Sequence, residues 1–195
     1  MALILRGNGV VEGLTDLPAG SVTAADLASG AITSSALPAG SVLQIVSTIK
    51  TDTFSTTTTI ASGGALLTGL SATITPLSTS SKILILCTLH TDGTVNITQA
   101  YAWLARGSTK IGAGDNSGSR IGIGTRGYYG DNNVSNALSM NYLDSPSTTS
   151  STTYNVYIGT QGSGTVVVNR TINDTDNVGD GARPASTITV MEVAG

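Results

Sequence analysis

The sequence predicts an all-β protein whose C-terminal part is an antiparallel β-sandwich, and three observations lead to this fold class. Only 11% of the residues are charged while Thr, Val and Ile are abundant, a composition typical of β proteins rather than of disordered chains. Apolar runs of strand length recur at short spacing after residue 43, separated by Gly, Pro, Asn and Ser turns. None of these runs shows a convincing helical period.

Strands are expected at short intervals from residue 43 to residue 193. The predicted segments are, in order, 43–49, 53–60, 66–75, 82–90, 95–106, 109–111, 135–143, 153–160, 165–170 and 186–193. Short strands at this spacing are typical of a sandwich or a barrel, and a jelly roll is the first choice among these topologies.

Three segments carry more specific expectations. The run from Lys82 to His90 is almost continuously apolar, which predicts a strand buried on both faces. Asp92-Gly93 is typical of a hairpin turn. Residues 112–133 are rich in glycine and are expected to form an irregular loop.

A ten-residue repeat precedes the predicted sandwich. The sequence Leu-Pro-Ala-Gly-Ser-Val at 17–22 recurs at 37–42, with a degenerate copy at 27–32 between them. A unit this small cannot bury its own apolar residues, so it needs neighbours along the chain and across other chains. Three chains around one axis would form a slender stalk with these side chains inside: Leu17, Val22, Leu27, Ile32, Leu37 and Val42. A flexible linker is the alternative interpretation.

These patterns divide the chain into an N-terminal segment at 1–16, a stalk at 17–42 and a sandwich head at 43–195. The apolar share of 39% is below the roughly 45–50% of ordinary globular domains. A chain with few apolar residues often completes its core by oligomerising, which agrees with a homotrimeric stalk.

Composition and charge argue against several classes of function. The nine Lys and Arg residues are scattered and aromatic residues are few, so nucleic-acid binding is not expected. No run approaches the ~18 apolar residues of a membrane span, and we expect a soluble protein made in the cytoplasm. The sequence predicts no enzyme, because Cys87 and His90 lie three residues apart and would point to opposite faces of a strand.

No cofactor or metal is expected either. Asp174, Asp176 and Asp180 could gather a calcium ion, but the loop lacks the EF-hand pattern and is better interpreted as a solvated acidic loop. Residues 122–127 match the dinucleotide fingerprint in letters only, because no helix is predicted to follow them.

The glycine-rich loop is the best candidate for recognition of a ligand. It carries aromatic, guanidinium and amide groups suited to carbohydrate or protein surfaces, at Arg120, Arg126, Tyr128, Tyr129 and Asn132. The alternative is a loop that packs between subunits.

Several motifs together resemble a known group of proteins. They are the opening Met-Ala-Leu-Ile-Leu-Arg-Gly-Asn-Gly, the Leu/Gly/Val decamers, and the segments 40–48, 69–76, 80–85 and 187–192. The chain resembles tail-fibre-like and virion-associated structural proteins of bacteriophages, notably those of aquatic bacteria. The resemblance implies a trimer with a thin stalk, a jelly-roll-like head and a place on the virion.

The short stalk favours a head fibre or capsid decoration over a long tail fibre. In this interpretation the partners are further copies of the chain and capsid or tail proteins. An N-terminal anchor would add a strand to a partner's sheet through Leu3, Ile4, Leu5, Val10 and Val11. The alternative is a receptor-binding tail fibre or spike whose head loops recognise host surface glycans.

Overall fold

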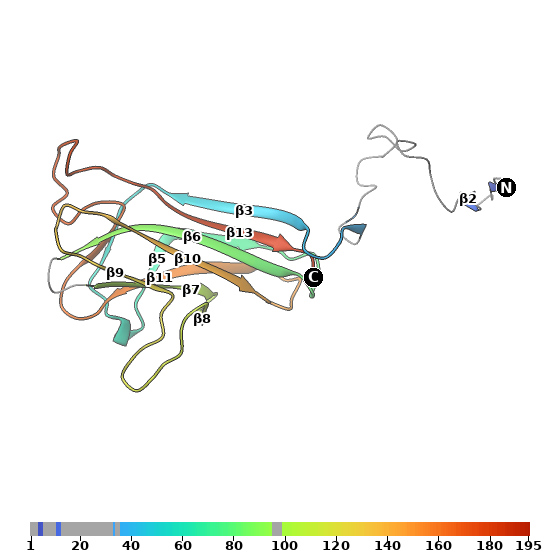
Figure 1. Cartoon of the computed structure of the whole chain (residues 1–195), viewed down its shortest axis with the longest axis horizontal. Helices are drawn as coiled ribbons and strands as arrows, with labels where there is room; N and C mark the ends of the chain where they lie inside the picture. Colours follow the sequence, from blue (N-terminus) through green and yellow to red (C-terminus); the bar gives the residue numbers. More distant parts are fainter. Residues whose placement is uncertain (1–3, 6–10, 13–32, 34–35, 95–98) are drawn as a thin grey trace. The chain divides into compact units, whose positions relative to one another are not determined.

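The computed structural model describes residues 4–5, 11–12, 33, 36–94 and 99–195. The chain forms two compact units, Met1–Leu37 and Pro38–Gly195. In the first unit, β1 (Ile4–Leu5) pairs with β2 (Val11–Glu12) in an antiparallel ladder. The second unit holds the sandwich (Figure 1).

Strands make up about half of the described part of the second unit. In chain order they are β3 (Val42–Lys50), β4 (Phe54–Thr56), β5 (Ala65–Ile74), β6 (Lys82–Gly93), β7 (Gln99–Arg106), β8 (Thr109–Ile111), β9 (Thr125–Tyr128), β10 (Asn136–Asp144), β11 (Thr152–Thr160), β12 (Val166–Val168) and β13 (Ser186–Val193). A single 3-10 turn, η3 (Ile60–Ser62), precedes β5 in this described part. The all-β prediction is confirmed.

The strands form two antiparallel sheets. The six-stranded sheet has the order β3-β13-β6-β12-β4, and β10 pairs with the other edge of β6. The five-stranded sheet has the order β5-β11-β7-β8, and β9 also pairs with β7. In Figure 1 the long strands of both sheets run in nearly the same direction, as in an aligned sandwich.

The pairing of the main strands is nested. β3 pairs with β13, β5 with β11, β6 with β10, and β7 with β9, so the first of these eight strands meets the last and the middle two meet each other. This is one long hairpin wrapped around a core, which is the jelly-roll arrangement of eight strands in two sheets. β4, β8 and β12 are short additions to it.

The core lies between the two sheets and follows from alternation along the strands. In β11 every second side chain is fully buried, at Tyr154, Val156 and Ile158, and in β13 Ile188 and Val190 are equally buried. These residues pack in one cluster with inward side chains of β5, β6 and β7. Each fully buried aliphatic side chain stabilises the fold by about 1.5–3 kcal/mol.

β6 differs from its prediction as a strand buried on both faces. Ile83, Ile85 and Cys87 point into the core, whereas Leu86 on the opposite face is 41% exposed in the single chain. The apolar run therefore contributes one face to the core and leaves the other as an apolar outer surface. Burial raises the pKa of the Cys87 thiol to about 12, so this side chain behaves as a small hydrophobe.

The turn predicted at Asp92-Gly93 is wrong, because both residues continue β6. Asp92 is fully buried, and its carboxylate accepts hydrogen bonds from the backbone N–H of Gly93 at 2.7 Å and of Ile172 at 2.9 Å. Burial raises the pKa of Asp92, and these two hydrogen bonds oppose that effect. The side chain thus tethers the 169–173 segment to the strand instead of closing a hairpin.

A second buried carboxylate, Glu192, lies near the end of β13. It accepts hydrogen bonds from Gln44 Nε2 at 2.5 Å and from the backbone N–H of Leu77 at 2.7 Å. Burial raises the pKa of Glu192, but the hydrogen bonds outweigh it and hold the pKa below its ordinary value of 4.5. The side chain is therefore ionised, and its carboxylate connects β13 to β3 and to the segment that follows β5.

Candidate functional site

The structure separates the five residues expected to bind a ligand. Arg120 and Arg126 line the same hollow, and Tyr128 is 65% exposed on β9. Tyr129 is a correction, because its ring is 1% exposed in the core and its hydroxyl lies 2.6 Å from Thr91 Oγ1. The backbone carbonyl of Asn132 accepts a hydrogen bond from the N–H of Asn173.

The expected irregular loop is partly ordered. β9 lies inside the 112–133 stretch and pairs with β7, which the glycine content concealed. The remaining loop, 112–124, connects β8 to β9. Hydrogen bonds fix the conformation of this loop. The backbone N–H of Ser117 donates to the carbonyl of Arg120, and the N–H of Arg120 donates to the carbonyl of Ser117. The backbone N–H of Gly122 donates to Asn116 Oδ1 at 2.6 Å.

Trp103 supports the region beneath this loop. Its ring stacks on Tyr157 with centroids 5.7 Å apart, and Lys110 Nζ lies 4.7 Å from the ring centroid. Lys110 also donates to the carbonyl of Gly122 at 3.0 Å. Trp103 is only 4% exposed although it points away from the core, because β8, the loop and the chain around Gly64 cover it.

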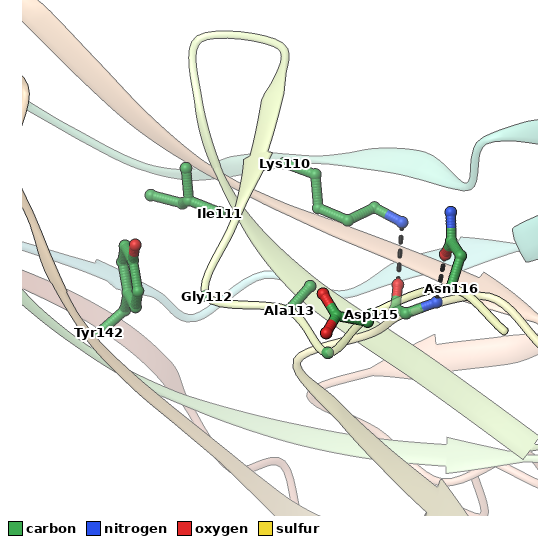
Figure 2. A pocket seen from close by; sticks show the side chains of 9 residues that line it. Lys110, Ile111, Gly112, Ala113, Asp115, Asn116 and Tyr142 are labelled. Carbon is green, nitrogen blue, oxygen red and sulfur yellow. Dashed lines mark hydrogen bonds between the residues drawn. The ribbon is translucent and has the colours of Figure 1, made fainter.

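Two hollows lie along the loop. The first, which we call the tyrosine hollow, has a volume of about 550 Å³ and is lined by Lys110, Ile111, residues 112–116, Gly122 and Tyr142. Figure 2 shows Tyr142 and Asp115 at this hollow, with Lys110 and Asn116 bonded to the loop backbone. It offers an aromatic ring and a carboxylate, while the Lys110 ammonium is already engaged.

The second hollow, which we call the arginine hollow, has a volume of about 510 Å³. It lies between η3, the outer face of the five-stranded sheet and the loop. Its lining residues are Ile60, Ala61, Tyr101, Ser119, Arg120, Ile121, Ile123, Arg126 and Gln161. Two guanidinium groups at one hollow can attract an anionic ligand.

The expected stalk and anchor residues fall mostly outside the described part of the chain. Leu17, Val22, Leu27 and Ile32 of the proposed axis, and Leu3 and Val10 of the proposed anchor, are among the residues that the structure does not describe. Leu37 and Val42 are 38% and 51% exposed in the single chain. Ile4, Leu5 and Val11 take part in the β1–β2 ladder.

The acidic loop after β12 contains an ion pair. Arg183 Nη2 lies 2.8 Å from both carboxylate oxygens of Asp174, so one of the three carboxylates weighed as calcium ligands is already paired with a side-chain cation. Among the described residues, no three His, Cys, Asp or Glu side chains lie close enough to hold a metal ion.

The remaining sequence motifs for chemistry also lie apart. Cys87 is buried in the core, and His90 is half-buried on the opposite face of β6, as the strand alternation predicted. Residues 122–127 lead into β9 rather than into a helix, so they lack the context of a dinucleotide site. In the portion of the chain that is described, no helix has the length and hydropathy to cross a bilayer.

Comparisons with known proteins give structural neighbours alone. No family model and no curated protein sequence matches the chain. Among solved structures, a chain of infectious bursal disease virus strain Gt has a TM-score of 0.40 and 16% identity. T=1 particles derived from the same virus give a TM-score of 0.40 and 15% identity, and its T13 particle gives 0.37 and 16%. Each match covers 77% of this chain but only 36–38% of the viral chain.

Proposed function

We propose that this protein is a non-enzymatic structural component of a bacteriophage particle: a short trimeric head fibre or capsid decoration, attached through its N-terminus. The observation that carries the proposal is the combination of a jelly-roll unit at 38–195 with a preceding unit that contains two of the three decamer copies. The motif resemblance to virion-associated proteins supports the same role.

Apolar side chains that one chain leaves uncovered support assembly into a trimer. Leu37 and Val42, which belong to the repeat, are both accessible in the single chain. A repeat that cannot bury these positions by itself gains stability when other chains cover them. The N-terminal β1–β2 ladder is too short to be stable alone, which suits a segment that binds a partner's sheet.

The outer face of the six-stranded sheet also favours association. Strand register aligns Ile45, Met191, Leu84 and Leu143 in one row across β3, β13, β6 and β10. Ile45 is 59% exposed and Leu143 is 47% exposed. Contiguous exposed apolar surface of this kind is typical of a protein–protein interface.

Incorporation into particles tests the proposal. An antibody against residues 38–195 should detect the protein in gradient-purified particles of the phage that encodes it. A variant lacking residues 1–16 should form the same oligomer in solution but remain outside the particles, because only the anchor is missing. Full-length protein that stays in the soluble fraction, or a truncated protein that still joins particles, would contradict the proposed role.

The second candidate function is a receptor-binding tail fibre or spike. The two hollows along the 112–124 loop favour it, because they place polar and charged groups on a fixed scaffold. If the protein binds a receptor, substitutions in the loop should lower adsorption of the phage to its host, while incorporation of the protein into particles stays normal. Normal adsorption of particles that carry such substitutions would contradict the receptor-binding function, and only the structural role would remain.

A further inference from the structure

We propose that the arginine hollow binds the acid group of a sugar, and that its ligand is a carboxylate-bearing residue of a surface glycan. This ligand class goes beyond the structural role, and it applies whether the protein sits on the capsid or on the tail. The inference rests on the placement of two guanidinium groups, on the absence of carboxylates among the lining residues, and on the apolar walls.

Arg126 is placed by the sheet. It lies on β9 directly opposite Tyr101 on β7, so the two side chains lie on the same outer face of the five-stranded sheet. Tyr101 is 9% exposed, and its hydroxyl donates to Gln99 Oε1 at 2.7 Å. The guanidinium of Arg126 is exposed and makes no hydrogen bond or ion pair with another described residue. It is therefore available to a ligand.

Arg120 is placed by its own turn. Its Nε donates to the carbonyl of Ser117 at 3.1 Å, and its Nη2 donates to Ser117 Oγ at 3.1 Å. These bonds hold one edge of the planar group, and Nη1 makes no further bond within the described chain. A side chain that is already oriented loses less conformational entropy when it binds.

The charge at the hollow is uncompensated. None of the lining residues is Asp or Glu, so a bound anion would meet two cations and no like charge. A guanidinium can donate two parallel hydrogen bonds to a carboxylate, which matches its planar geometry better than it matches a neutral hydroxyl. The site should therefore distinguish an acidic sugar from its neutral counterpart.

The walls argue for an organic ligand rather than for a free inorganic ion. Ile60, Ile121 and Ile123 line the hollow together with the amide of Gln161. Aliphatic walls can contact the C–H faces of a sugar ring, and the amide can bond to its hydroxyls. A volume of about 510 Å³ lies within the range of small-molecule sites.

Two matched pairs of oligosaccharides test the inference on the full-length protein. Cellobiouronic acid differs from cellobiose by one carboxylate, and 3′-sialyllactose differs from lactose by an acidic sugar. Titrations followed by NMR should show at least one acidic member binding about tenfold more tightly than its neutral partner, because a hydrogen bond to a charged group is stronger than one between neutral groups. The difference should shrink at high salt.

Substitutions locate the binding. Arg126→Gln and Arg120→Gln should each weaken the acidic sugar about tenfold, while affinity for the neutral sugar stays the same. Lys82→Gln removes a charge that is also exposed but does not line the hollow, and it should leave both affinities unchanged. All three residues are exposed, so melting curves should confirm that the variants fold.

Three results would overturn the inference. The first is no binding of either acidic sugar, or equal binding of the acidic and neutral members of both pairs. The second is acidic-sugar affinity that survives both arginine substitutions. The third is displacement of the sugar by inorganic phosphate or acetate at the same concentration, which would mark a general anion site. None of these results depends on whether the protein is found in particles.

Discussion

Gly64→Ala is the perturbation that most sharply probes the support beneath both hollows. Gly64 has φ of +64°, and a Cβ added there would overlap the Trp103 ring and lie 3.1 Å from the carbonyl oxygen of Ile158. Gly63 provides a matched control, because its φ is +90° and an added Cβ would meet nothing within 4 Å. Both substitutions place an alanine at positive φ, but only the one at Gly64 meets Trp103 and β11.

The expected magnitudes follow from these contacts. An alanine in the left-handed region costs about 1–2 kcal/mol, and this cost applies to both positions. Overpacking adds about 1–3 kcal/mol at Gly64 only. We therefore expect Gly63→Ala to lower the free energy of unfolding by about 1–2 kcal/mol and Gly64→Ala by about 2–5 kcal/mol.

Urea unfolding at one protein concentration measures both values. Trp103 is the single tryptophan of the chain, so its fluorescence reports unfolding and its native environment together. Native Gly64→Ala should show altered tryptophan emission, because the ring must move from Tyr157 or Lys110. Equal destabilisation by the two alanines, with native emission unchanged, would refute the packing described for Trp103.

Three further predictions concern buried polar groups. Tyr154→Phe removes the 2.7 Å hydrogen bond from the hydroxyl to the Asp144 carboxylate and should cost about 1.5–3 kcal/mol in urea unfolding; Tyr157→Phe removes no hydrogen bond within the described chain and should cost far less. Glu192 has a folded pKa below its ordinary 4.5, so its stabilisation is present above that value and is lost as the pH falls through the folded pKa. Glu192→Gln should therefore lose less stability on acidification than the native chain. An acid-unfolding profile identical to that of the native chain would contradict the role of the carboxylate. The variant must be compared with the native chain because Asp92, whose pKa is raised, contributes to the pH dependence of stability in the opposite direction. The Cys87 thiol, with a pKa of about 12, should react with a thiol reagent in urea but not in buffer, and fast labelling of the folded protein would show that it is not in the core.

The strands that alternate in sequence were the most predictable part of the fold. In 153–160 and 186–193 the alternate residues Tyr154, Val156 and Ile158, and Ile188 and Val190, are apolar, and the structure buries them between the sheets. The period of two is set by the strand itself, so it can be read without knowing the partner strand. The nested pairing was predicted only as a preference among topologies.

Long-range partners explain what the sequence could not predict. Asp92 resembles a turn residue locally, but its carboxylate bonds to the N–H of Ile172, eighty residues away. Tyr129 lies in a glycine-rich segment that resembles a surface loop, yet its hydroxyl lies beside Thr91. In both cases the deciding contact comes from a strand or segment that local composition does not indicate.

The candidate site was predicted in part. Arg120 and Arg126 were chosen from the sequence, whereas Tyr101 and Gln161 come from other strands and loops that the fold brings to the same hollow. The apolar run at β6 predicted burial on two faces, but a sequence records only that the outer residues are apolar. It does not say which surface covers Leu84 and Leu86.

The mass of the full-length protein in solution, measured by light scattering, tests the central claim most directly. Assembly through the repeat predicts a mass near three times 19.6 kDa. In such a trimer, the other two copies would cover the apolar residues of the repeat. A mass of 19.6 kDa at micromolar or higher concentration would contradict the trimeric stalk and the role built on it.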